Sequence, residues 1–431
     1  MNMIRFSFFM VLSLSTGIIY AQKNSTVSNS FSLQQCVDYA MENNPNVIIA
    51  TYEKDIADTQ IKETLSQGLP QANVDLGINY NFEPQKSLID ISTFDPSVPE
   101  GTEQEVSFQQ QYDGNLNFNV RQLIFDGSFF VGLQAANTFK ELSTKDHIKT
   151  KIDVVEAVSK AYYTALVTEE QYNLLEVNFA RLDSLLSETQ AMFDQGFVEK
   201  IDVSRLKVQH NNLKVQLKNT KELAKVSYDL LKFQMGMPIA TEIELTDDLE
   251  EVSLDILDEQ GFDYGSRIEY SQLQTNLALI NLDIKNNRVQ YLPNLYANFN
   301  YGYNTQAAES NQWFQTNRWL SYGFVGLSLN VPVFDGFLKR SRIQRNKIQL
   351  SQTEQSFKLL ENTIDLEIKQ SKINMSTALD NMEAQRTNKE LAEEIYNVTR
   401  LKYQEGIGSN FEVVEADEDF KAAQTNYYNA L

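Results

Sequence analysis

Four stretches of the chain alternate apolar and polar residues with a period of two. In the first of them, Val74, Leu76, Ile78 and Tyr80 are separated by Asp, Gly and Asn residues. Such alternation over about ten residues predicts a strand with one apolar and one polar face. The four predicted strands cover, approximately, residues 72–83, 113–126, 293–305 and 318–334.

Apolar residues recur at three- and four-residue spacing in most of the remaining chain. Val155, Val158 and Tyr162 follow this spacing, which predicts one face of a helix. Ser32 and Gln35 form a capping-box pattern that opens a pair of shorter helices ahead of the first strand. At 1.5 Å per residue the two longest predicted helices would each reach roughly 100 Å. The predicted helices after the first pair cover residues 127–195, 198–236, 266–290, 336–405 and 409–431.

The same order of elements occurs twice, which predicts an internal repeat. The stretch GNLNFNVRQLIFDG from Gly114 matches GLSLNVPVFDG from Gly326, and FDQGFVEKIDV from Phe193 matches YQEGIGSNFEV from Tyr403. The matches keep their order and their separation, as a duplicated unit requires. We predict a first structural repeat over residues 22–250 and a second over 251–431. The end of the first repeat has no counterpart, so either the sequence is a fragment or the last helix ends early.

Both repeats carry Phe-Asp-Gly where a predicted strand passes into a long helix. We expect the Asp to cap the helix and the Gly to permit a tight turn. A Leu-Pro pair stands at the opposite transition, from helix into strand. The predicted strand–helix joints are Pro70, Asp126, Gly127, Pro293, Asp335 and Gly336.

The N-terminus has the pattern of a secretory signal peptide. Arg5 precedes an apolar run over residues 6–20, and Ala21 provides a small residue for cleavage. A membrane anchor is the alternative, but the run is short and contains Ser13 and Ser15. We therefore predict a cleaved signal peptide over residues 1–21 and an exported protein.

Composition and charge exclude several classes of function. A hydrophobic content of 42% predicts a folded chain, and a formal charge of -21 argues against a nucleic-acid partner. The two histidines, His147 and His210, lie in charged helical tracts away from any His/Cys/Asp cluster at metal-binding spacing. The sequence also has no Gly-rich phosphate loop and no nucleophile elbow. We predict no catalytic residue, no cofactor and no metal, and hence no enzyme.

The four strands have the length and pattern of outer-membrane barrel strands, apolar toward lipid and rich in Asn toward water. An ordinary half-buried antiparallel sheet is the alternative. Four strands do not close into a barrel, and an open edge in lipid leaves backbone groups unsatisfied. If the strands lie in a membrane, several copies of the chain must therefore share one barrel.

From Phe31 to Leu431 the chain resembles the TolC family of outer-membrane channel proteins. The resemblance rests on the stretch FSLQQCVDYAMENNPNV, the prolines before the strands, both Phe-Asp-Gly motifs and the glycine breaks at Gly196 and Gly406. It implies an α+β membrane protein: a homotrimer whose transmembrane β-barrel continues as a long periplasmic α-helical barrel of coiled coils. It also implies a belt near residues 236–264 and surface loops over residues 83–111 and 305–317.

The resemblance implies a passive exit duct in the outer membrane of a Gram-negative bacterium, in contact with outer-membrane lipid. Such a duct serves multidrug efflux or type I secretion, together with a periplasmic adaptor protein and an inner-membrane transporter of RND, ABC or MFS type. A structural or adhesive coiled-coil envelope protein without channel activity is the alternative function, and it accounts for the helices but not for the strands.

The resemblance also assigns roles to residues near the glycine breaks. Glu412 and Glu415, three residues apart on one helix face, would form an acidic ring at the periplasmic entrance. The alternative is that both are solvated surface acids. Asp202 and Arg205 occupy the matching positions of the first repeat, where Arg205 is a candidate latch toward the acidic ring. The residues expected to contact the adaptor are Gly196, Phe197, Gly406 and Gly408.

Overall fold

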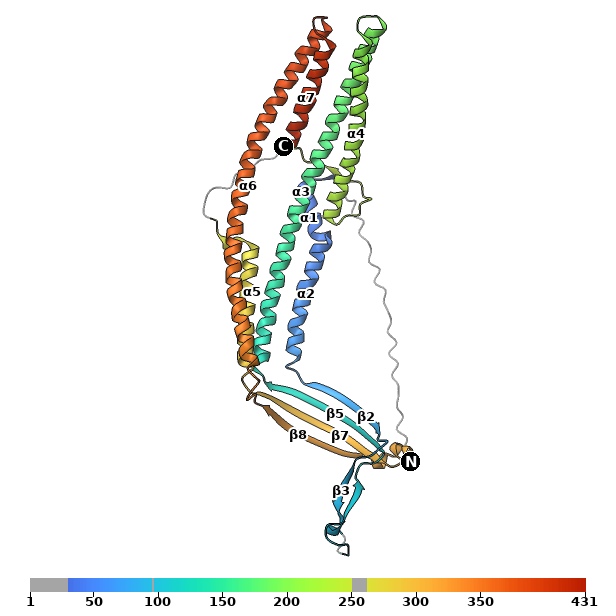
Figure 1. Ribbon diagram of the computed structural model, residues 1–431, viewed down its shortest axis with the longest axis vertical. Coiled ribbons are helices and arrows are strands. Elements are labelled where there is room, and N and C mark those ends of the chain that lie inside the picture. Colours follow the sequence, from blue (N-terminus) through green and yellow to red (C-terminus); the bar gives the residue numbers. More distant parts are fainter. Residues whose placement is uncertain (1–29, 95–96, 250–261) are drawn as a thin grey trace.

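The computed structural model describes residues 30–94, 97–249 and 262–431, so the predicted signal peptide lies outside the described residues. The described chain is elongated (Figure 1). Long helices run along its length, and a curved four-stranded sheet lies at one end of them. Helices and strands therefore form two separate layers along one axis.

The sheet is antiparallel, with the strand order β2-β5-β7-β8. Its register places Val74 opposite Phe118, and Phe118 opposite Tyr301. One residue along, Asn73 faces Asn119. The alternation in the four strands therefore adds up to one apolar and one polar face. The strands are β2 (Gln71–Tyr80), β5 (Tyr112–Phe125), β7 (Asn294–Ala307) and β8 (Leu320–Asn330).

The helices pack side by side in the order α2, α3, α5 and α6 above the sheet (Figure 1). Away from the sheet, α3 pairs with α4 and α6 pairs with α7 to form two antiparallel coils. In the described ranges, none of the helices is both long and apolar enough to cross a membrane. The helices are α1 (Leu33–Asn43), α2 (Pro45–Ser66), α3 (Gly127–Asp194), α4 (Lys200–Met235), α5 (Ile268–Val289), α6 (Leu338–Gln404) and α7 (Asn410–Ala430).

A compact core lies half way along the helices, where α1, α3 and α4 meet. Cys36, Val158 and Leu231 are fully buried there. Beside them, β1 (Ser30–Phe31) pairs in parallel with β6 (Glu244–Leu245). Of the predicted belt, residues 250–261 lie outside the described residues.

The structure differs from the sequence prediction in one surface loop. Residues 83–111, expected to be a loop, contain a hairpin of β3 (Lys86–Asp90) and β4 (Glu103–Ser107), which projects beyond the sheet (Figure 1). Lys86 Nζ lies 2.9 Å from Glu105 Oε2 across this hairpin. The strands are short and largely polar, so hydrophobic alternation gave no signal for them.

The second strand–helix joint is longer than predicted. β8 ends at Asn330 rather than near residue 334, because Pro332 has no N–H to donate to a ladder. α6 begins at Leu338 because Gly336 and Phe337 have positive φ angles of 65° and 66°. Such backbone angles are incompatible with a right-handed helix.

Candidate functional site

The polar face of the sheet is a network of amide and carboxylate groups. Asn119 Nδ2 donates to Asp75 Oδ2 at 2.7 Å, and Asn300 donates to Asn119. Nearer the hairpin, Asn79 Nδ2 donates to Asp113 Oδ1 at 2.7 Å. Such a surface is hydrated and carries few cations, which suits the lining of an aqueous passage.

Two glycines make room for this network. A Cβ at Gly77 would lie 2.2 Å from Asn115 Oδ1, and a Cβ at Gly302 would lie 2.3 Å from Asn117 Oδ1. Both glycines sit opposite these asparagines in the register. The alternation of β2 and β7 places both glycines on the polar face. The reason for glycine is an asparagine on the neighbouring strand, which the sequence alone does not bring next to it.

The opposite face of the sheet is apolar and exposed. Val325, Leu327 and Leu329 of β8 are 79%, 73% and 64% exposed. A continuous apolar patch of this kind is unfavourable in water and indicates an apolar partner. The sheet therefore separates an apolar surface from a polar one.

The two strand–helix joints use the same tripeptide differently. Asp126 caps α3 by accepting a hydrogen bond from the Ser128 N–H at 2.7 Å. Asp335 accepts from the Lys339 N–H at 3.1 Å, and this bond lowers the pKa of the Asp335 carboxyl. Both aspartates thus satisfy backbone donors at a helix start. Pro70 and Pro293 directly precede β2 and β7.

The reason for Gly127 differs from the predicted one. Among the two joint glycines, only Gly336 has a positive φ. A Cβ at Gly127 would instead lie 2.9 Å from the Cβ of Val289, at the end of α5. Gly127 is therefore needed for close packing of α3 on α5, whereas Gly336 is needed for the turn.

Asp126→Ala is expected to lower the free energy of unfolding by about 1 kcal/mol, because the first turn of α3 loses its cap. Thermal or chemical unfolding of the purified protein measures this loss. Asp126→Asn keeps an acceptor and serves as the matched control, with a smaller loss expected. An equal loss in both variants would contradict the capping role.

The far ends of the two coils have matching geometry. Gly196 has a φ of +81°, and the Phe197 N–H donates to the Met192 carbonyl at 2.9 Å. Gly406 has a φ of +75°, and the residue after it donates to the Lys402 carbonyl at 3.0 Å. At both tips the chain therefore leaves its helix through a residue in the left-handed conformation, which favours glycine.

Each tip presents one large apolar side chain. Phe197 is 81% exposed, and Ile407 is 79% exposed at the equivalent position. Ile407 was missed from the sequence, although its place directly after the glycine could have identified it. The predicted contact residue Gly408 instead donates its N–H to the Lys402 carbonyl at 3.1 Å.

The structure places the predicted entrance residues near the starts of α4 and α7. The Asp202 carboxylate accepts from the Glu199 N–H at 3.2 Å, so it caps α4. The Arg205 guanidinium lies 5.6 Å from the Phe411 ring centroid. Glu412 and Glu415 are exposed on α7. Within the described part of this chain, no ion pair joins Arg205 to either glutamate.

A buried ion pair between the two coils was not predicted. Arg181 Nε of α3 lies 2.9 Å from Asp417 Oδ1 of α7, and Lys421 Nζ lies 2.5 Å from the other oxygen. The Asp417 side chain is only 3% exposed. The Arg181 guanidinium also lies 4.9 Å from the ring of Tyr396 and 5.1 Å from that of Phe420. This ion pair is buried among aromatic rings.

Further hydrogen bonds extend this contact along α3 and α7. Asn178 Nδ2 donates to Gln424 Oε1 at 3.2 Å, and Gln171 Nε2 donates to Asn429 Oδ1 at 2.7 Å. Burial in the same contact raises the pKa of Tyr396. The partners lie more than 200 residues apart in sequence, so helical periodicity alone did not identify them. A charged residue on an otherwise apolar stripe, such as Asp417, was the available signal.

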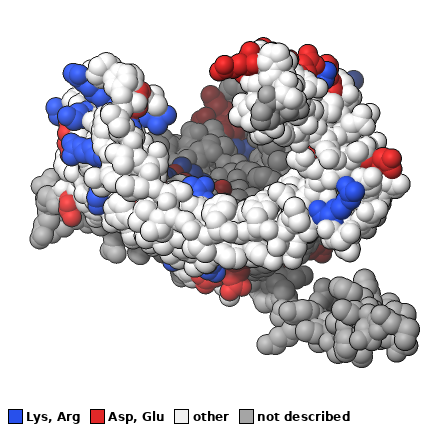
Figure 2. Space-filling model, turned by 90° about the horizontal axis from the view of Figure 1, so that it is seen from below, with Lys and Arg blue, Asp and Glu red and all other residues white. Residues whose placement is uncertain are grey.

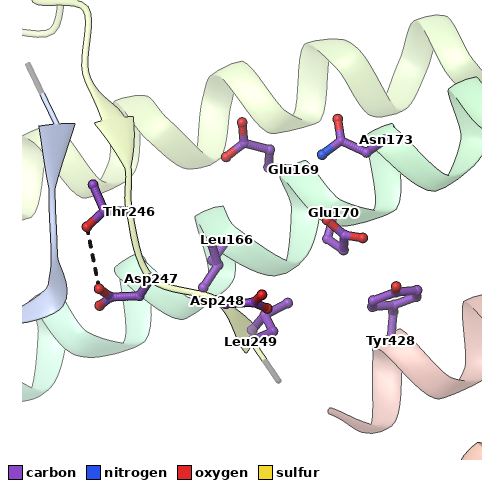
Figure 3. A pocket seen from close by; sticks show the side chains of 9 residues that line it. All are labelled: Leu166, Glu169, Glu170, Asn173, Thr246, Asp247, Asp248, Leu249 and Tyr428. Carbon is purple, nitrogen blue, oxygen red and sulfur yellow. Dashed lines mark hydrogen bonds between the residues drawn. The ribbon is translucent and has the colours of Figure 1, made fainter. Parts of the chain in front are cut away.

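An acidic hollow of about 410 Å³ lies beside the central core (Figure 3). Glu169 and Glu170 of α3 line it, with Asp247 and Asp248 from the segment after β6. Asp247 Oδ2 accepts from the Leu33 N–H at 2.9 Å, and Glu169 accepts from the Tyr228 hydroxyl. No group of three or more His, Cys, Asp or Glu residues in the described ranges is arranged to hold a metal ion. Asp247 and Glu169 each accept a hydrogen bond from a neighbouring element, α1 and α4 respectively.

Comparison with known proteins gives relatives of one kind. Residues 269–431 match the family model described as outer membrane efflux protein. The outer membrane protein TolC of Vibrio cholerae is 19% identical over 93% of this chain and 87% of its own length. The probable efflux pump outer membrane protein TtgC of Pseudomonas putida is 22% identical over 74% of this chain and 66% of its own. The crystal structure of CusC superimposes with a TM-score of 0.72 at 13% identity, covering 92% of this chain and 88% of CusC.

Proposed function

We propose, from the family match and the relatives above, that the chain is a TolC-family outer membrane factor and forms the outer-membrane exit duct of an efflux system. The observation that carries this proposal is the sheet, with its exposed apolar face and its amide-lined polar face. Lipid would cover the first face, and the conducted substrate would pass along the second. The duct itself performs no chemistry.

We propose that three copies complete the channel. In the described chain β2 and β8 form the edges of the sheet, and each would leave unpaired backbone groups in lipid. Pairing β2 of one copy with β8 of the next would close a barrel. The helices would continue this barrel into the periplasm, where the two internal repeats supply equivalent coils.

The second support for a trimer is a stripe on α6. Ile348, Leu359, Leu366 and Ile373 recur at helical spacing, and each is more than half exposed. They lie on α6 at the edge of the helical layer, and α2 forms the other edge (Figure 1). α2 of a neighbouring copy is the partner that we propose for this stripe.

The mass of the detergent-extracted protein tests this assembly. We expect a trimer in mild detergent, because barrel closure and the α6 stripe both require neighbours. A monomer that keeps its fold in the same detergent would contradict the proposal.

We propose that the coil tips form the periplasmic entrance. In a trimer Glu412 and Glu415 would bring six carboxylates together, which favours cations and disfavours close approach of the coils. Arg205 remains a proposed latch toward these acids on a neighbouring copy. The buried pair of Arg181 and Asp417 would hold the two coils of one copy together while the entrance is closed.

The tips are also the proposed contact for a periplasmic adaptor protein, which would connect the duct to an inner-membrane transporter. Phe197→Asp with Ile407→Asp is expected to abolish co-purification of the adaptor, because a charged side chain replaces each exposed apolar anchor. Trimer mass should stay unchanged, because both side chains lie on the turns beyond the ends of α3 and α6, away from the sheet edges and the α6 stripe.

A matched control replaces exposed apolar residues on α4 away from the tip, with Val208→Asp and Val215→Asp. Adaptor binding that survives the tip substitutions but not the control substitutions would move the contact to the side of the coil.

A further inference from the structure

The start of α6 is the most basic segment of this acidic protein. The chain has a formal charge of -21, yet the ten residues LKRSRIQRNK contain no acid. The first acidic residue of α6 is Glu354. Seen from the sheet end, more of the visible Lys and Arg side chains lie at one side of the molecule than at the other (Figure 2). The cations of the segment are Lys339, Arg340, Arg342, Arg345 and Lys347.

Exposed apolar side chains lie directly before this basic segment. Val333 is 92% exposed, Phe334 76% and Phe337 60%. The rings of Phe334 and Phe337 lie 5.5 Å apart, edge to face. They lie between the end of β8 and the start of α6. An apolar surface that ends in aromatic rings and then in cations is typical of a membrane–water interface.

The cations of α6 fall on two opposite flanks. The face that packs along α5 carries half-buried Ile343 and buried Asn346. At 100° per residue, exposed Ile348 lies on the opposite side. Between these faces, one flank carries Arg340 and Lys347, and the other carries Arg342 and Arg345.

The rest of α6 distinguishes the two flanks. The flank of Arg342 and Arg345 continues with uncharged polar residues, namely Gln349, Gln352 and Ser356. The uncharged polar character of this flank matches that of the amide-rich polar face of the sheet. The flank of Arg340 and Lys347 continues with charged residues, namely Glu354, Lys358 and Glu361. In the proposed channel the amide-rich flank would therefore face the lumen, and the charged flank would face outward.

We propose that Arg340 and Lys347 form a binding site for the phosphate headgroup of an anionic phospholipid in the leaflet that faces the periplasm. Both side chains are exposed, and side chains on a helix lean toward its N-terminus, here toward the apolar sheet. Phe334 and Phe337 would contact the acyl chains beside the bound headgroup. Lys339 is excluded from the site because its Nζ lies 3.2 Å from Asp335 Oδ2. The inference rests on the proposed function, since it requires the sheet to lie in the membrane.

Lipid titration of the full-length protein in mild detergent tests this site. Phosphatidylglycerol, phosphatidylcholine and soluble glycerol phosphate are each added, and binding is followed by native mass spectrometry and thermal shift. Phosphatidylglycerol is expected to bind most tightly.

Arg340→Gln with Lys347→Gln should weaken its binding by roughly 25-fold, at about fivefold per cation, and leave phosphatidylcholine binding unchanged. The matched control, Arg342→Gln with Arg345→Gln, removes two cations from the other flank and should change binding by less than about twofold.

Equal binding of the two phospholipids by the unmodified protein would overturn the inference. The inference would also be overturned if the Arg342 and Arg345 variant lost its preference for phosphatidylglycerol while the Arg340 and Lys347 variant kept it. Glycerol phosphate binding as tightly as phosphatidylglycerol would show a free-phosphate site instead. A trimer that conducts in pure phosphatidylcholine without any anionic preference overturns this inference alone, whereas a protein that neither forms trimers nor conducts overturns the proposed function.

Discussion

Asp417→Ala is expected to weaken the contact between the two coils by about 3 kcal/mol and to raise the conductance of the channel. The substitution leaves the Arg181 guanidinium without its anion in a largely buried site. Removing one partner of a buried ion pair costs roughly 3 to 5 kcal/mol. The lower value applies here, because Arg181 is 19% exposed and keeps two aromatic rings beside it. Chemical unfolding and single-channel recording measure the two effects.

Two controls make this prediction specific. Glu418 lies on the same helix as Asp417 and accepts an exposed 2.6 Å hydrogen bond from Gln209 of α4. Glu418→Ala removes this acceptor and should cost less than about 1 kcal/mol. The double variant of Arg181→Ala and Asp417→Ala should cost less than the sum of the single ones, because the Arg181 charge is no longer left without its anion. Lys421 loses its anion equally in Asp417→Ala and in the double variant. Unchanged conductance in Asp417→Ala would contradict a role for this pair in holding the entrance closed.

Leu327→Arg is expected to lower the stability of the trimer by about 3 kcal/mol, because it places a cation on the lipid-facing side of β8. The side chain lies in the middle of the strand and is 73% exposed on the apolar face. Heat resistance of the trimer in gel electrophoresis or in a thermal shift assay measures the loss.

Ser328→Arg adds the same side chain one residue later, on the polar face of the same strand. It should leave the trimer nearly as stable and shift ion selectivity toward anions, because the new cation lies in water. Equal destabilisation by the two substitutions would mean that the sheet does not separate lipid from water.

The strands and long helices could be predicted because each carries its own periodicity. β2 and β5 lie within a few residues of their predicted bounds, whereas the end of β8 was misplaced because Pro332 interrupts its alternating pattern. The hairpin of β3 and β4 is short and polar, and α6 starts late because of two left-handed residues. Local sequence does not encode such features strongly.

The candidate site was only partly predictable, for a different reason. The helix break at Gly196 was predicted from the helical pattern, and the structure gives it a positive φ. The adaptor contact at Phe197 was implied by the family resemblance and stays a prediction. The pair of Arg181 and Asp417 joins helices more than 200 residues apart. Packing between the two coils determines which residues pair, and a single sequence does not specify that packing.

Planar-bilayer recording of the purified protein tests the central claim most directly. We expect discrete conductance steps from trimers, larger in Asp417→Ala than in the unmodified protein. A protein that binds to the bilayer as a trimer but passes no current in either form would contradict the claim that this chain is an exit duct.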